Sequence, residues 1–313
     1  MKISAHVRLR VLPAAASFWL ALSIGTAQAF PVDFGPGFST RKVVVDSCIV
    51  SVTVGGHGPA VVLLHGYTQD SRMWKPLAKR LASRFTIIAP DLPGIGNSSI
   101  PSTGLDMKMS AKRIRDAVYS LGYSHVYVVG HDFGLMVAYG YAAMYPREVA
   151  KLALLDAFLP GLPGWQQVYD APTMWHFRFV GPTPLALVSG RESIYFNYFW
   201  NDLAADGTRS LPESDRLHYI AAYSRPGRMA AGWAYFAAFP KTATDFAVLA
   251  RTRLNIPVLT IAGDKSAGAV LGAQGKIIAS DVTAVVLKDT GHWVMEERPS
   301  ETMSAVTQFL ERP

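Results

Sequence analysis

The sequence predicts an α/β fold, in which a mostly parallel sheet is covered by helices on both faces. Short apolar segments alternate with amphipathic stretches along most of the chain. A strand that is apolar on both sides must be buried on both faces, and parallel strands are joined by helices. The segments that we expect to form strands are 42–45, 49–54, 60–64, 85–89, 126–129, 152–155, 256–261 and 284–287.

The first 29 residues are expected to form an export signal that precedes the fold. The start of the chain is basic, residues 11–25 are apolar, and Ala27-Gln28-Ala29 matches an A-x-A cleavage site. The apolar segment is too short to span a bilayer. We therefore expect a periplasmic or secreted protein that has no membrane association after cleavage.

The charge and cysteine content exclude some classes of function. The chain has 30 basic and 23 acidic residues, and without the three basic residues of the signal 27 remain, which gives a net charge of +4. No cluster of lysines and arginines accompanies this small surplus, which argues against nucleic-acid binding. Cys48 is the only cysteine, so no disulfide can form within the chain. The sequence is compatible with a homodimer as well as with a monomer.

One long interruption breaks the alternation of strands and helices. Residues 158–240 are rich in Trp, Tyr, Phe and His, contain Pro and Gly breaks, and show no strand pattern. We expect this segment to form a helical cap inserted after the sixth strand of the sheet. The core would then consist of residues 30–157 and 241–313, and the mature chain is long enough for one large domain with such an insertion.

The pentapeptide Gly130-His131-Asp132-Phe133-Gly134 lies between an apolar strand and a helix-like stretch at 135–144. A strand, a sharp turn and a helix, with small residues two positions on either side of the centre, form a nucleophile elbow. The central residue is usually serine, whereas here it is Asp132. An aspartate is ionised at neutral pH and can attack without a base, but it needs an electrophile with strain or a good leaving group. Epoxides and alkyl halides meet this requirement.

Two further segments supply partners for such a nucleophile. The loop His65-Gly66-Tyr67-Thr68 follows a strand, as the oxyanion loop does in hydrolases with an elbow. The backbone N–H groups of Tyr67 and Phe133 are therefore the expected oxyanion hole. His292 follows the last strand and would take a proton from a water molecule. The histidines show no metal-ligand spacing such as HExxH, so we expect no metal and no other cofactor.

A carboxylate is also needed to orient the His292 ring, and the sequence offers two. Asp156 ends the sixth predicted strand, and Asp264 follows the seventh. Both positions suit the chain order of nucleophile, acid and histidine.

With these motifs the chain resembles α/β hydrolases that have an aspartate nucleophile, namely epoxide hydrolases, haloalkane dehalogenases and haloacetate dehalogenases. Within that group it is most similar to the exported bacterial epoxide hydrolases of the Cif type. The shared features are the export signal, the His-Gly loop, an Asp-Leu-Pro-Gly turn at 91–94, the His-Asp elbow, the acid after the sixth strand, Trp175-His176-Phe177 in the cap and the terminal Gly291-His292-Trp293. The resemblance implies an α/β-hydrolase fold. It also favours Asp156 over Asp264, because many relatives carry their acid after the seventh strand where this chain has Ser266.

The resemblance further implies two cap residues that assist epoxide opening, a histidine and a tyrosine. The histidine corresponds to His176. Straight counting places the tyrosine at Phe236, so its neighbour Tyr235 is the expected substitute.

The residues around the leaving group distinguish the subclasses. Dehalogenases of this group carry a tryptophan or an arginine after the nucleophile, where this chain has Phe133. Tyr67 and Phe177 stand at the other positions where a halide-binding side chain is usual. We therefore expect an epoxide hydrolase that acts on a small apolar epoxide and water. The alternatives are a haloalkane or haloacetate dehalogenase with the same triad, and a binding or effector protein whose elbow is vestigial.

Overall fold

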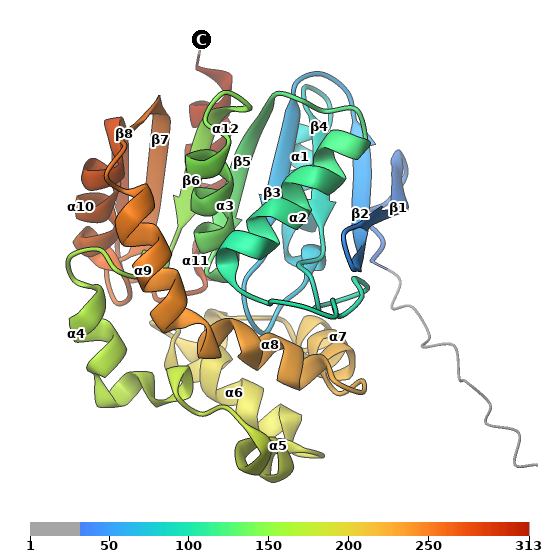
Figure 1. The fold of residues 1–313 in the computed structure, drawn as a ribbon, viewed down its shortest axis with the longest axis vertical. Helices are drawn as coiled ribbons and strands as arrows, with labels where there is room; N and C mark the ends of the chain where they lie inside the picture. The colour runs from blue at the N-terminus through green and yellow to red at the C-terminus, as the bar shows by residue number, and fades with distance from the viewer. Residues whose placement is uncertain (1–31, 313) are drawn as a thin grey trace, which may run out of the picture.

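An eight-stranded sheet forms the centre of the computed structural model, which describes residues 32–312 (Figure 1). The strand order is β1-β2-β4-β3-β5-β6-β7-β8. The pairs β1–β2 and β2–β4 are antiparallel, and all other neighbouring pairs are parallel. The bounds are β1 (Phe38–Val45), β2 (Cys48–Gly56), β3 (Ala60–Leu64), β4 (Thr86–Pro90), β5 (Val126–His131), β6 (Val149–Leu155), β7 (Leu254–Gly263) and β8 (Ala279–Leu287).

The predicted fold class is confirmed, and each predicted strand corresponds to one of these eight. The largest difference is at β8, which begins at Ala279 and not at 284. Its first half carries polar residues because β8 is an edge strand that is covered on one side only, so the apolar pattern misses it. The predicted export signal at residues 1–29 lies outside the described residues.

Alternate residues of the central strands pack on opposite faces of the sheet. In β3, Val61 and Leu63 point into a core shared with α1, α11 and α12, whereas Val62 and Leu64 point into a core shared with α2, α3 and α10. This alternation is what a parallel sheet with helices on both faces requires. The bounds are α1 (Lys75–Leu81), α2 (Met107–Ser120), α3 (Phe133–Met144), α10 (Gly268–Ile278), α11 (Val294–Glu297) and α12 (Pro299–Glu311), with a short 3₁₀ helix, η1 (Ser71–Trp74), before α1.

The segment between β6 and β7 is helical. Its helices α4 to α8 lie below the ends of the strands in Figure 1, and we call this part the cap. The final helix of the segment, α9, packs against α2 and α3 and leads back to the sheet. Among residues 32–312, no helix is both long enough and apolar enough to cross a bilayer. The bounds are α4 (Trp165–Asp170), η2 (Pro172–Phe177), α5 (Pro182–Val188), α6 (Glu192–Asp202), η3 (Gly207–Arg209), α7 (Glu213–Tyr223), α8 (Arg228–Ala237) and α9 (Phe239–Leu249).

Candidate active site

Asp132 sits on a sharp turn between β5 and α3, with a φ of 54° that is rare for a residue with a side chain. The two flanking glycines make this turn sterically feasible. A Cβ on Gly130 would lie 2.1 Å from the carbonyl oxygen of Gly134, and a Cβ on Gly134 would lie 2.1 Å from that of Leu64. The small residues of the pentapeptide are therefore required by the close approach of α3 to β3 and β5.

The carboxylate of Asp132 is held by backbone N–H groups. The N–H of Tyr67 donates to Oδ1 over 2.7 Å, and the N–H of Phe133 also bonds to the carboxylate. A Cβ on Gly66 would collide with Asp132, which explains the glycine in the His-Gly loop. Burial raises the pKa of Asp132, and the charge of His292 and the two N–H groups offset only part of this effect. The two N–H groups predicted as the oxyanion hole thus both bond to this carboxylate.

His292 lies between two carboxylates. Its Nδ1 is 2.8 Å from Oδ2 of Asp156, and its Nε2 is 3.7 Å from Oδ2 of Asp132. The first distance is a hydrogen bond, and the second is too long for one. Burial lowers the pKa of His292, but the hydrogen bond to Asp156 and the charges of Asp156 and Asp132 outweigh it, so the pKa is raised. The ring is therefore oriented by Asp156 and faces Asp132 across a gap.

The two candidate acids have different surroundings. Asp156 is fully buried, and its carboxylate accepts hydrogen bonds from His292, from Ser266 Oγ over 2.6 Å and from the backbone N–H of Gly263 over 2.9 Å. Asp264 is part of a turn, where it accepts from the N–H of Thr290 and lies 3.5 Å from Lys265 Nζ. The geometry brings Asp156 to the histidine. Ser266 is a partner of this acid that the sequence did not reveal, although it stands where many relatives carry their own acid.

The loop that contains His292 is also hydrogen-bonded to the end of α6. The N–H of His292 donates to the carbonyl of Leu203 over 2.8 Å, and Trp293 Nε1 donates to the carbonyl of Phe199 over 2.9 Å. Glu297 of α11 accepts from the N–H of Ala205 over 2.9 Å. Cap and core therefore share hydrogen bonds directly beside the histidine.

A cavity of about 270 Å³ lies between the core and the cap. Asp132 and His292 contribute to its wall from the core, and His176 from the cap. His176 is buried, and burial followed by the charge of His292 lowers its pKa to about 3. Its Nδ1 is without a hydrogen-bond partner among the described residues. The apolar part of the wall consists of Tyr67, Met136, Ala157, Phe158, Trp165, Met174, Phe177, Phe199, Leu203, Phe236, Phe239 and Trp293.

Four polar residues of the wall lie on exposed parts of the chain. They are Thr173, Asp202, Lys265 and Ser266. They mark the side on which the cavity meets the surface.

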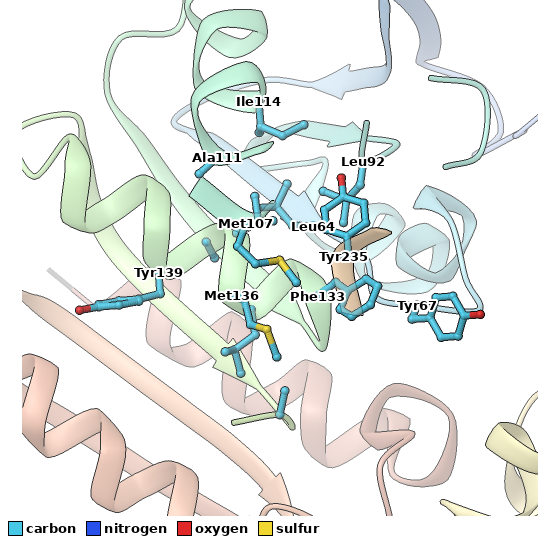
Figure 2. Close-up of a cluster of buried hydrophobic side chains, with 14 of the residues drawn as sticks. Leu64, Tyr67, Leu92, Met107, Ala111, Ile114, Phe133, Met136, Tyr139 and Tyr235 are labelled. Carbon is cyan, nitrogen blue, oxygen red and sulfur yellow. The ribbon is translucent and has the colours of Figure 1, made fainter. Parts of the chain in front are cut away.

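Tyr235 does not lie where its predicted role needs it. Its hydroxyl donates to the carbonyl of Pro93 over 2.9 Å and accepts from Ser110 Oγ over 2.9 Å. Figure 2 shows its ring over Phe133, with the hydroxyl pointing away from Phe133. The two ring centroids are 5.2 Å apart. Phe236 lines the cavity in its place. Consecutive residues of a helix point about 100° apart, so the neighbour in α8 cannot replace the side chain at Phe236.

The hydroxyl groups of other cap tyrosines are also engaged. Tyr195 accepts from Trp233 Nε1 over 3.0 Å, and the same N–H bonds to the hydroxyl of Tyr67 in the core over 2.8 Å. Tyr198 donates to the carbonyl of Thr173 over 2.9 Å.

Within residues 32–312, no group of three or more His, Cys, Asp and Glu residues has the arrangement of a metal site.

The family model of the alpha/beta hydrolase fold matches residues 59–299. The chain belongs to the α/β-hydrolase fold family. Among the relatives of this α/β hydrolase, a soluble epoxide hydrolase from Corynebacterium sp. (strain C12) is 32% identical over 277 residues, which cover 86% of this chain and 96% of that enzyme. A fluoroacetate dehalogenase from Burkholderia sp. is 32% identical over 184 residues, 55% of this chain and 60% of that protein.

A solved structure adds a similarity of fold. The Cif epoxide hydrolase from Acinetobacter nosocomialis superposes on this α/β hydrolase with a TM-score of 0.81 at 23% identity, over 89% of this chain and 90% of that one. Together these relatives confirm the resemblance to epoxide hydrolases that the motifs predicted, and they support a hydrolase activity.

Proposed function

We propose that this α/β hydrolase opens an epoxide to a vicinal diol through an ester on Asp132. The observation that carries the proposal is that the two oxygens of the Asp132 carboxylate have different surroundings. Oδ1 is bound by the N–H of Tyr67, while Oδ2 faces the cavity side where His292 lies 3.7 Å away. One oxygen is thus held and the other is available to attack.

In the first step Asp132 Oδ2 attacks an epoxide carbon, and the C–O bond of the ring breaks with its electrons going to the oxygen. His176 is the cap residue that can donate a proton to this oxygen. Because its pKa is near 3, its ring is neutral and carries a single N–H. A neutral imidazole is a suitable donor to an alkoxide, which is strongly basic.

In the second step a water molecule attacks the ester carbon, and His292 Nε2 takes its proton. The gap between Nε2 and Asp132 Oδ2 leaves room for that water. The charge that develops on Oδ1 lies against the N–H group of Tyr67, and the N–H group of Phe133 also bonds to this carboxyl group. The ester C–O bond then breaks, and the leaving diol oxygen takes the proton from His292. The second proton of the attacking water leaves Asp132 and passes through solvent to restore the N–H of His176.

Ester formation removes the negative charge of Asp132 from beside His292, and this favours the second step. The charge of Asp132 contributes to the raised pKa of His292. Once Asp132 is an ester this charge is absent, so the imidazole loses a proton more readily at the step in which it must be a base.

A dehalogenase with the same three residues is the second candidate, and the similarity to a fluoroacetate dehalogenase favours it. The inner wall argues against it. Phe177 of the wall is apolar, as is Phe133 beside the nucleophile, and the cationic side chain in the wall, Lys265, is 59% exposed. A halide or a haloacetate would therefore meet rings where it needs N–H groups.

The intact mass of the His292→Gln variant tests the proposal. The variant is exposed to styrene oxide, cyclohexene oxide, 1-bromobutane and fluoroacetate. A gain of one whole epoxide molecule is the expected result, because the ester forms and its hydrolytic base is missing. A gain of the halide substrate minus hydrogen halide would replace the proposal by the dehalogenase, and no gain would favour a binding protein. The double variant with Asp132→Asn serves as the control and should gain nothing.

We further propose, from the N-terminal sequence alone, that the reaction takes place in the periplasm or outside the cell. Fractionation of cells that express the full chain, with N-terminal sequencing of the recovered protein, tests this. A mature chain that begins at Phe30 is the expected result, and an uncleaved cytoplasmic chain would contradict it.

A further inference from the structure

The carboxylate of Asp156 is buried and receives four hydrogen bonds, one of them from Ser266, which is itself exposed to solvent. Oδ1 accepts from the N–H groups of Gly263 over 2.9 Å and Ala267 over 3.4 Å. Oδ2 accepts from Ser266 Oγ over 2.6 Å and from His292 Nδ1 over 2.8 Å. A carboxylate has about four lone-pair sites, so all of them are occupied. Ser266 is the one side-chain hydroxyl in this set.

We propose that Ser266 is a positioning residue for ester hydrolysis, because its hydroxyl holds the oxygen of Asp156 that orients His292. The inference rests on the proposed function, since it assigns a role within the second chemical step. Ser266 touches the imidazole only through Asp156, although the residue also borders the cavity.

The backbone of Asp156 is already fixed, which leaves the carboxylate as the movable part. Its N–H donates to the carbonyl of Ile261 over 2.8 Å, and its φ is 34°. Small rotations about the last side-chain bond would still turn Oδ2, and the ring of His292 that is bonded to it would turn with it. The Oδ1 atom is restrained by two N–H groups, one of which is long at 3.4 Å. The short bond from Ser266 is therefore the main restraint on Oδ2 besides the imidazole itself.

The hydroxyl also shares the charge of Oδ2 with the imidazole. A donor at Oδ2 withdraws electron density from the oxygen to which His292 Nδ1 donates. Without the hydroxyl, Oδ2 would hold the His292 proton more strongly, and the pKa of His292 would rise further. More of the histidine would then be protonated at neutral pH and unable to act as a base. The first step does not use His292 as a base and should be unaffected.

Three variants test this. Ser266→Ala removes the hydroxyl, Ser266→Thr keeps it, and Ser224→Ala is a matched control, since the Ser224 hydroxyl bonds to the carbonyl of Ile220 on an exposed helix end. Rapid mixing with styrene oxide, quenching and intact-mass analysis give separate rates for ester formation and ester decay.

For Ser266→Ala we expect ester decay to fall about tenfold, the effect of one hydrogen bond to a charged group, while ester formation stays within about twofold. Ser266→Thr and Ser224→Ala should decay as the unchanged enzyme does. Equal decay in Ser266→Ala and the unchanged enzyme would overturn the inference. So would an equal fall in both steps, which indicates a structural role.

A titration without substrate separates this inference from the proposed function. The pKa of His292, followed by NMR of its ring, should be higher in Ser266→Ala than in the unchanged enzyme and Ser266→Thr. An unchanged pKa would overturn the inference even if the ester forms. The His292→Gln variant could instead take up no epoxide while the pKa of His292 is still higher in Ser266→Ala. In that case the contact between Ser266 and Asp156 is established and the proposed function fails.

Discussion

The two halves of the cavity are built from different interactions. On the core side, Asp132, Asp156 and His292 follow strands and are bound by backbone N–H groups and by each other. On the cap side, His176 lies among rings, with ring centroids of Phe177 and Phe199 4.6 and 4.8 Å away and its Nδ1 without a partner among residues 32–312. The core half therefore fixes its charged groups with hydrogen bonds, whereas the cap half fixes one neutral group by packing.

This difference matches the chemistry that each half is proposed to perform. The core carries the negative charge of the nucleophile and the positive charge of the protonated histidine, and such charges need partners in a buried site. The cap supplies a single proton to a leaving oxygen, for which a desolvated neutral imidazole suffices. The following predictions test whether the two halves can be separated by experiment.

The largest effect is expected in the core, from loss of the nucleophile. Asp132→Asn should reduce diol formation by about 10⁴-fold or more, because no covalent ester can form. Turnover of styrene oxide measures this, and an unchanged circular dichroism spectrum shows that the fold is retained. Substantial turnover in the variant would contradict the covalent mechanism.

The second test compares the two acids of the core. Asp156→Asn should slow ester decay by about 10³-fold, since a neutral partner neither fixes the working tautomer of His292 nor stabilises its protonated form. Asp264→Asn is the matched control and should change the rate by less than about twofold, as a surface substitution does. Single-turnover mass analysis measures both. The opposite ranking would assign the role to Asp264.

The third test moves to the cap. His176→Phe should slow ester formation by about 10²-fold by removing the proton donor, and leave ester decay unchanged. Tyr235→Phe should leave both rates unchanged and lower the free energy of unfolding by about 1–2 kcal/mol, because it removes the bonds to Ser110 and Pro93. Urea unfolding measures the second effect. A loss of ester formation in Tyr235→Phe would restore its predicted role.

The pH dependence distinguishes the two steps by the pH at which each rate falls. His292 must be unprotonated to act as a base. In the ester Asp156 still raises the pKa of His292 but the charge of Asp132 is absent, so ester decay should increase with pH through a value below the pKa of His292 in the free enzyme. Below it, decay should fall by about tenfold per pH unit. Ester formation needs ionised Asp132, whose pKa is raised above 3.8, and neutral His176, whose pKa is about 3. Formation should thus lose rate only at lower pH than decay does. Single-turnover rates across pH measure both limbs, and coincident limbs would contradict the assignment.

The smallest effect is a gain in the cap. Phe236→Tyr places a hydroxyl at the cavity wall and should accelerate ester formation by a few-fold, up to about tenfold for one added hydrogen bond. Phe239→Tyr, at another ring of the wall, is the comparison variant and should not accelerate it. A slower first step in Phe236→Tyr would contradict this expectation. It would show that the packing of the Phe236 ring matters more than the added hydroxyl.

The same contrast explains what could be predicted from the sequence. Asp132 could be found because the turn demands glycine at fixed distances, as the close contacts of Gly130 and Gly134 show. His292 and its acid could be placed because each follows a strand of a parallel sheet, where side chains converge. The position of Tyr235 could not be predicted, because the face that a cap helix presents to the cavity depends on how the helix packs. The partner role of Ser266 was also beyond the sequence, since it depends on a loop that folds over Asp156.

The hydrogen bonds from the His292 loop to Leu203 and Phe199 limit how a substrate can reach Asp132. If the cap lifted as a rigid lid, the end of α6 would pull on the loop that carries the base, and the distance of Nε2 from the nucleophile would change with it. We therefore expect the cap to stay closed during turnover. Substrate would pass instead through the exposed stretch of wall at Thr173, Asp202 and Lys265, and the width of that opening would decide which epoxides are admitted.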